Sequence, residues 1–258
     1  MLCDITPVIL TFNEAANLER ALVPLWWARD IVVVDSFSTD GTTTIAECHP
    51  SVRLIQRSFD THTKQWTFAV ERTEIETTWI LALDADYVLT PDFVEELRSV
   101  KDDGVIAAYR ASFQYCIDGI SLRSSLYPPV PVLFRRGHGH YVQDGHTQRL
   151  SVAGRIGMLK AKIRHDDRKP LSDWLLSQDR YMRLEAEHLA SQDWSDLAFP
   201  DKVRRLPPLA PFLAFAYCYF GKCIFLDGRR GLYYALQRLL AEALLALRLI
   251  EIRRDGRK

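Results

Sequence analysis

The sequence lacks the features that define several classes of protein. It contains few cysteines, which are scattered, odd in number and without metal-ligand spacing: Cys3, Cys48, Cys116, Cys218 and Cys223. A disulfide framework and a structural zinc site are therefore excluded, and reduced thiols are expected. Internal repeats and low-complexity tracts are also missing. With 258 residues, of which 48% are hydrophobic, the chain is typical of one sizeable folded domain plus an appendage.

A long uninterrupted apolar run is missing as well. The most apolar stretch, residues 207–226, begins with two prolines, contains Gly221 and Lys222, and is soon followed by paired arginines. About 15 suitable residues remain, fewer than the ~20 that a membrane-spanning helix needs. Residues 1–4 show neither the positive region nor the apolar core of a secretory signal. We therefore expect a cytoplasmic chain that does not cross a membrane.

The chain has no net charge, because 33 basic residues balance 33 acidic ones, but the charge is unevenly distributed. Residues 201–258 hold 12 Lys or Arg against 5 Asp or Glu, a net +7, which leaves −7 for residues 1–200. Basic residues beside an apolar stretch suit an anionic membrane surface, where each is worth roughly 1 kcal/mol. Helices that pack on the rest of the chain and expose a basic face would give the same pattern. Nucleic acid is not expected as a partner, because long aliphatic stretches interrupt the positive charges.

The first hundred residues alternate between strand and helix patterns. Apolar, β-branched runs at 5–12, 31–35, 52–57 and 79–84 are separated by helical patterns at 13–22, 43–47 and 64–72. This alternation predicts an α/β fold with a mostly parallel sheet flanked by helices, and with ligands bound at the carboxyl ends of the strands. We expect Thr11, Asp35, Arg57 and Asp84 to converge at that edge.

An acidic pair, Asp84 and Asp86, follows the most apolar of these runs. Carboxylates at the end of a buried strand need a cation, and hard divalent cations take oxygen ligands that they commonly share with substrate phosphates. The same pair would also suit a solvated turn before the helix expected after Thr90.

Three ordered segments, at 11–14, 33–42 and 83–86, resemble the signatures of family 2 inverting glycosyltransferases with the GT-A fold. Within that family the chain is most similar to bacterial lipopolysaccharide-core β-glucosyltransferases, with looser matches at 144–146, 163–165 and 227–235. The resemblance implies a Rossmann-like GT-A catalytic domain at 1–168, with a nucleotide-binding half at about 1–100 and an acceptor half at about 101–168. Residues 169–258 would form a helical, basic and apolar extension that associates with a membrane.

For the metal, the resemblance implies that Asp86 coordinates Mg²⁺ or Mn²⁺. Asp84, with Ala85, would contact the ribose of the donor or reach the metal through water. His165 is the candidate third protein ligand, because GT-A enzymes can return a C-terminal histidine to the metal. A histidine after a short apolar strand is also commonly structural, and hard cations bind without one.

For the donor, the resemblance implies a nucleotide pocket at the first two strand ends. Four neighbouring residues are expected to line it: Thr11, Phe12, Asn13 and Glu14. A carboxylate at Asp35 can accept a hydrogen bond from the imide of uracil, which favours a UDP-sugar. Arg57 and Lys64 either meet the base or diphosphate or are solvated surface charges.

An inverting transfer also needs a general base that takes the proton of the acceptor hydroxyl. Asp144 and His146 lie where the resemblance places acceptor-site residues, and Asp144 is favoured over His146. A third possibility is that neither residue is the general base. Gly145 departs from the familiar pattern, in which an acidic pair opens a helix, so this segment would also suit a turn.

The expected function is the transfer of one sugar from a nucleotide-diphosphate donor to a glycolipid or lipopolysaccharide-core acceptor at the inner face of the cytoplasmic membrane. Two alternatives share the fold and the donor pocket. One is a transferase that acts on a polyprenyl-diphosphate-linked glycan. The other is a membrane-docked protein that binds sugar nucleotides without transferring them.

Overall fold

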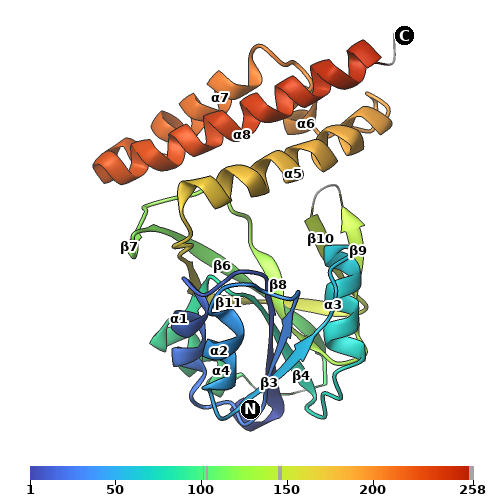
Figure 1. The fold of residues 1–258 in the computed structure, drawn as a ribbon, viewed down its shortest axis with the longest axis vertical. Coiled ribbons are helices and arrows are strands. Elements are labelled where there is room, and N and C mark those ends of the chain that lie inside the picture. Colours follow the sequence, from blue (N-terminus) through green and yellow to red (C-terminus); the bar gives the residue numbers. More distant parts are fainter. Residues whose placement is uncertain (101, 103, 145–146, 256–258) are drawn as a thin grey trace. The chain divides into compact units, whose positions relative to one another are not determined.

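The computed structural model describes residues 1–100, 102, 104–144 and 147–255 (Figure 1). The chain forms two compact units. The first comprises Met1–Ser121, Tyr127–Val142 and Gln148–Lys169, and the second comprises Leu122–Leu126, Gln143–Thr147 and Pro170–Lys258. The division into a catalytic domain at 1–168 and an extension at 169–258 stays a prediction.

The first unit is built on one large sheet. Its strands lie in the order β3-β2-β1-β4-β8-β6-β11-β5, and β7 pairs with β6. The bounds are β1 Ile5–Thr11, β2 Ile31–Asp35, β3 Val52–Gln56, β4 Trp79–Asp84, β5 Tyr87–Leu89, β6 Ile106–Ile117, β7 Ile120–Ser121, β8 Val130–Arg135 and β11 Arg155–His165. Strands β1 to β4 are parallel to their neighbours among themselves, as predicted, whereas β8 runs antiparallel between β4 and β6. Strands β9 (Gly139–Asp144) and β10 (Thr147–Val152) form a separate two-stranded sheet.

Helices cover both faces of the parallel strands. Helices α1 (Leu18–Leu22), α2 (Thr42–Glu47) and α4 (Pro91–Ser99) lie on one face, and α3 (His62–Glu71) lies on the other (Figure 1). Alternate strand residues accordingly enter two cores: Val33 packs in the α1, α2 and α4 core, and Val32 and Val34 pack in the α3 core. Runs that are apolar at every position are required because both faces of a parallel sheet are buried.

The helix expected at 13–22 is much shorter in the structure, because α1 begins only at Leu18. Asn13 adopts φ 53°, a left-handed conformation that a continuous right-handed helix cannot contain. Residues 12–17 therefore form a loop at the carboxyl end of β1. By contrast, α3 begins two residues earlier than expected, because the Thr61 side chain caps it by accepting from the Lys64 amide.

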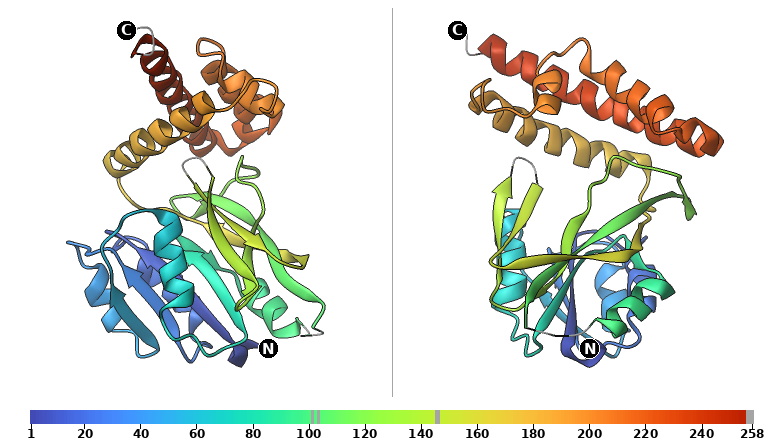
Figure 2. Two further views of the ribbon diagram at one scale, coloured as in Figure 1. Left: turned by 90° about the vertical axis from the view of Figure 1, so that its right-hand side faces the viewer. Right: turned by 180° about the vertical axis from the view of Figure 1, so that it is seen from behind.

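The second unit is helical. Its helices are α5 (Leu171–Ser191), α6 (Phe199–Arg204), α7 (Ala210–Ala216) and α8 (Gly228–Asp255), with a π turn η3 (Tyr217–Gly221) and a 3₁₀ turn η4 (Ile224–Asp227) between α7 and α8. Figure 2 shows α7 and α5 running alongside α8. Apolar residues of α5 and α8, including Met182 and Leu245, form its core. In the part of the chain that the structure describes, no helix has both the length and the apolar composition of a membrane span.

Candidate active site

Strand register brings three predicted residues to one edge of the sheet. Thr11 pairs with Asp35 across β1 and β2, and Leu10 pairs with Asp84 across β1 and β4. Because all three strands run parallel, their carboxyl ends meet at the edge where open α/β sheets bind ligands. The predicted convergence of Thr11, Asp35 and Asp84 is therefore present in the backbone.

Asp35 is fully buried at this edge and is held by several donors. Its Oδ1 accepts from Thr11 Oγ1 at 2.9 Å and also from the Ser38 hydroxyl, and its Oδ2 accepts from the Ser38 amide at 2.8 Å. Gln56 Nε2 lies 3.4 Å from Oδ2. These bonds fix the loop that follows β2 around the Asp35 carboxylate.

Two loops after β1 and β2 hold one another through backbone groups. The Asn13 amide donates to Ser38 Oγ at 2.8 Å, and the Thr39 amide donates to Asn13 Oδ1 at 2.8 Å. The Glu14 amide donates to Thr42 Oγ1 at 2.7 Å. These bonds hold the two loops, and with them the predicted residues at 11–14, together at the carboxyl edge of the sheet.

The other predicted donor contacts differ in their surroundings. Phe12 is 51% exposed at the end of β1, so its ring is available to a flat ligand. Arg57 binds Asp60 with two nitrogens, each at 3.1 Å, and Lys64 lies 3.5 Å from the same carboxylate. Arg57 also lies 5.4 Å from the Phe68 ring. In this structure Arg57 and Lys64 are engaged with α3 and the residues before it, and their donor role stays a prediction.

The acidic pair lies at the end of β4, with the buried Ala85 between its members. Burial and the neighbouring Asp86 carboxylate raise the pKa of Asp84 to about 6. Burial also opposes ionisation of Asp86, but His165 outweighs it and lowers the pKa of Asp86 below its usual value. Two carboxylates this close resist ionising together, which is the electrostatic setting in which a cation is favourable.

His165 contacts Asp86 directly. Its Nε2 lies 3.0 Å from Asp86 Oδ2, and although burial would lower the pKa of His165, Asp86 raises it. Antiparallel pairing of His165 with Tyr87, and the Asp166 amide bond to the Asp86 carbonyl at 3.0 Å, place the ring there. Four aromatic rings surround the imidazole at centroid distances of 4.8–6.5 Å: Tyr87, Phe113, Tyr115 and Tyr127.

The side chains of Asp86 and His165 meet some of the requirements of a divalent-cation site. Asp86 Oδ1 and His165 Nδ1 are buried without a hydrogen-bond partner, so each side chain has one polar atom that its contacts within the protein do not use. However, among the described residues no three His, Cys, Asp or Glu side chains are placed to hold a metal ion together. Mg²⁺ and Mn²⁺ bind carboxylate oxygens and commonly complete their shells with substrate phosphate and water, so a set of few protein ligands suits them.

A polar network beside the acidic pair was not predicted from the sequence. Lys169 Nζ lies 2.6 Å from Glu14 Oε1, and the buried Asn17 donates to Glu14 Oε2 at 2.8 Å and to Asp167 Oδ1 at 2.9 Å. Arg20 donates to Asp166 Oδ2 at 2.7 Å. The network ties the loop after β1 to the segment after β11. Its sequence signal is the charged run at 164–169, which follows the predicted histidine directly.

Glu14 has an unusual protonation equilibrium within this network. Burial raises its pKa from 4.5 to about 7, even though Lys169 opposes the shift. Burial would lower the pKa of Lys169, but the Glu14 carboxylate raises it above its usual value. The Asp86 carboxylate also raises the pKa of both groups, so Lys169 is a cation held close to the acidic pair.

The predicted general bases lie at the limit of what the structure describes. Asp144 is the last residue of β9, and its side chain lies outside the described part of the chain, as does the whole of His146. Their assignment as base therefore stays a prediction.

The structure is that of an α/β protein that carries a paired-aspartate motif at the carboxyl end of its parallel strands. The model of the family described as "Glycosyl transferase family 2" matches residues 6–160, more than half of the chain. The chain therefore belongs to glycosyl transferase family 2. The family and the GT-A fold expected from the sequence are confirmed.

Individual relatives are similar to this chain either over part of its length or at low sequence identity. An uncharacterized glycosyltransferase of Rickettsia bellii (strain RML369-C) is 35% identical over 97 residues, which cover 37% of this chain and only 32% of the relative. The lipopolysaccharide core biosynthesis glycosyltransferase LpsC of Rhizobium meliloti (strain 1021) is 25% identical over 193 residues, 69% of each chain. The crystal structure of S. aureus TarS 1-349 in complex with UDP matches with a TM-score of 0.50 at 13% identity, covering 97% of this chain and 91% of that TarS 1-349 chain. This last similarity concerns the fold.

Proposed function

We propose that this protein transfers one sugar from a UDP-sugar to a saccharide carried by a lipid, with inversion at the transferred carbon. The observation that carries the proposal is the acidic pair of Asp84 and Asp86, which lies at the same carboxyl edge of the sheet as Thr11 and Asp35. The nucleotide would lie over the β1 and β2 ends, and its diphosphate would reach the acidic pair.

Asp86 and His165 would hold Mg²⁺ or Mn²⁺, with Asp84 contacting the metal through water or contacting the ribose. When bound, the metal would neutralise the negative charge that develops on the departing nucleotide diphosphate, a term that is commonly large in group transfer. The protein's part is to orient the imidazole by the aromatic rings around it and to keep the Asp86 carboxylate ionised beside it.

Lys169 would supply a second positive charge to the same leaving group. Its ammonium lies 2.6 Å from Glu14, and protonation of Glu14, whose pKa is about 7, would weaken that ion pair. A lysine released in this way can bind a phosphate oxygen. We expect Lys169→Met to reduce transfer more than Lys162→Met, which removes an exposed lysine of β11.

On the acceptor side, Asp144 is proposed as the general base and His146 as its alternative. The acceptor is proposed to be a lipopolysaccharide-core or other lipid-linked saccharide, supported by the similarity to LpsC over 69% of the chain. A polyprenyl-diphosphate-linked glycan remains the second candidate. The extension at 169–258 would bring the enzyme to the membrane surface where such acceptors lie.

The test is product formation with a panel of nucleotide sugars, Mg²⁺ or Mn²⁺, and extracted glycolipid acceptors. Wild type should transfer sugar from a UDP-sugar, whereas Asp86→Ala and Asp144→Asn should be severely impaired. Asp92→Ala, which removes an exposed carboxylate of α4, is the matched control and should stay active. Donor binding without transfer to any acceptor would contradict the proposal and favour a binding protein. Unchanged transfer by Asp144→Asn would contradict the base assignment.

A further inference from the structure

The turn between α7 and α8 exposes apolar side chains in a compact group. Phe220, Phe225 and Leu226 are 61%, 42% and 55% exposed. The ring centroids of Phe220 and Phe225 lie 6.4 Å apart, so the two aromatic surfaces adjoin each other. Lys222 lies between them in the sequence, and its ammonium is 5.5 Å from the Tyr217 ring. An aromatic surface with a lysine on the same turn is therefore open to solvent within the second unit.

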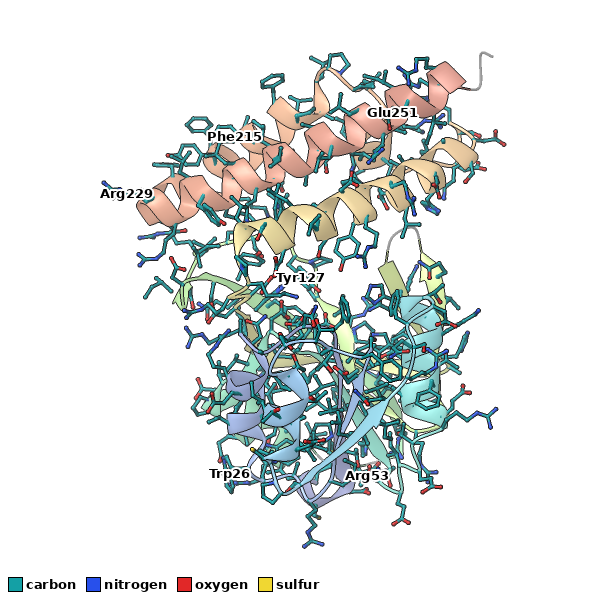
Figure 3. The ribbon with its side chains drawn as sticks, viewed as in Figure 1. Trp26, Arg53, Tyr127, Phe215, Arg229 and Glu251 are labelled. Atoms are coloured by element: carbon teal, nitrogen blue, oxygen red, sulfur yellow. The ribbon has the colours of Figure 1, made fainter. Side chains whose placement is uncertain are left out.

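Two arginines extend this surface into α8. Arg229 and Arg230 are exposed in its first turn, and within the described residues neither pairs with a carboxylate. Figure 3 shows Arg229 at the end of α8. The sole acidic residue at 206–241 is Asp227, which forms an ion pair with Arg123 at 3.4 Å and accepts from the Arg123 amide at 3.0 Å. The turn is positively charged, and its one carboxylate is already neutralised.

The charge pattern favours one kind of partner. Exposed apolar groups of this kind commonly mark a contact with a protein or a membrane. A second copy that used the same turn would place arginines against arginines without an acidic counterpart, and such like-charge contacts are unfavourable. An anionic bilayer supplies both complements, because its phosphates attract the basic groups and its acyl boundary accepts the rings.

We propose that six residues of this turn dock the protein on anionic phospholipid. The docking turn comprises Phe220, Lys222, Phe225, Leu226, Arg229 and Arg230. Its rings enter the headgroup boundary, and its cations contact lipid phosphates. The inference deepens the proposed function, since it rests on an acceptor that is carried by a lipid, and it narrows the membrane contact from the whole extension to one turn.

The experiment is co-sedimentation of the full chain with vesicles, without donor or acceptor. Vesicles of equal parts phosphatidylglycerol and phosphatidylethanolamine should bind wild type, and vesicles of phosphatidylcholine should bind it much more weakly. Each basic residue at an anionic surface is worth roughly 1 kcal/mol, or about fivefold in partitioning, so Arg229→Gln with Arg230→Gln should reduce binding roughly 30-fold. Phe220→Ser with Phe225→Ser should also reduce it.

Matched controls separate the turn from general effects. Lys160→Gln with Lys162→Gln removes two exposed positive charges from β11, and Phe199→Ser removes a ring that is 79% exposed in α6. Both should bind vesicles as wild type does. Equal binding to phosphatidylcholine, or losses in the control variants that match those in the docking-turn variants, would overturn the proposal. So would a concentration-dependent dimer in sedimentation that the Phe220→Ser, Phe225→Ser variant abolishes.

UDP binding, measured on the same variants by calorimetry, keeps this proposal distinct from the proposed function. Loss of vesicle binding with retained UDP binding is the expected behaviour of docking-turn variants. Wild type that binds UDP but no vesicle would overturn the docking proposal alone. Wild type that binds vesicles but no UDP would overturn the proposed function alone.

Discussion

Glu14 is expected to lower the stability of the protein, relative to a Glu14→Gln variant, as the pH rises from about 4.5 to about 7. Burial raises the pKa of Glu14 from 4.5 to about 7, although Lys169 lies 2.6 Å away. A carboxyl group whose pKa is raised by folding favours the folded state while it is protonated, and this contribution is lost as the pH rises through the folded-state pKa. One pKa unit corresponds to about 1.4 kcal/mol, so the upper limit of the loss is about 3 kcal/mol.

The assay is urea unfolding of wild type and Glu14→Gln at about pH 4 and about pH 8, together with NMR titration of the Glu14 carboxyl carbon. The free energy of unfolding of wild type, relative to the variant, should fall between these two pH values. The opposite trend, in which wild type gains stability over the variant as the pH rises, would show that the ion pair with Lys169 outweighs burial. Burial would then not be the dominant effect on the Glu14 carboxylate.

Three further predictions concern single side chains. A Cβ on Gly231 would lie 1.8 Å from the Ile224 carbonyl oxygen, so Gly231→Ala should lower the free energy of unfolding of the second unit by roughly 1–3 kcal/mol. Gly41→Ala is the control and should be nearly neutral. Equal melting temperatures of Gly231→Ala and wild type would contradict this packing. Asp35→Asn should weaken UDP binding in calorimetry and lower the free energy of unfolding by roughly 1–3 kcal/mol, because a fully buried acceptor of several hydrogen bonds is lost. Unchanged UDP affinity would show that Asp35 does not contact the donor. Arg204→Met should destabilise the helical unit by roughly 3–5 kcal/mol in urea unfolding, because it removes the guanidinium that forms ion pairs with the largely buried Glu185 and Glu242. A more stable variant would show that these ion pairs are replaceable.

The parallel half of the sheet could be predicted because its strands carry a strong sequence signal. Val32, Val33 and Val34 are buried on both faces, and such uninterrupted apolar runs are typical of central parallel strands. The same alternation of strands and helices placed Thr11, Asp35 and Asp84 at one edge without any contact information. The antiparallel insertion of β8 between β4 and β6 could not be predicted, because no local pattern states which strands become neighbours.

The rest of the site depends on contacts between distant residues. Lys169 and Glu14 form their ion pair across 155 positions of sequence, so neither residue signals the other locally. The left-handed Asn13, which ends the expected helix at 13–22, is held by Ser38 and Thr39 of the next loop. The family resemblance, by contrast, assigned Asp86 and His165 to one metal ion. The structure places the two side chains 3.0 Å apart, and their role as metal ligands stays a prediction.

We expect the acidic pair to bind a cation together with the donor diphosphate. Calorimetric titration of UDP into the full chain, with Mn²⁺ and then with excess chelator, tests it most directly for wild type, Asp86→Asn and the control Asp92→Asn. We expect Mn²⁺ to strengthen UDP binding to wild type and to the control, and to have little effect on Asp86→Asn. Equal UDP affinity in Mn²⁺ and in chelator, or an unchanged metal effect in Asp86→Asn, would contradict the claim.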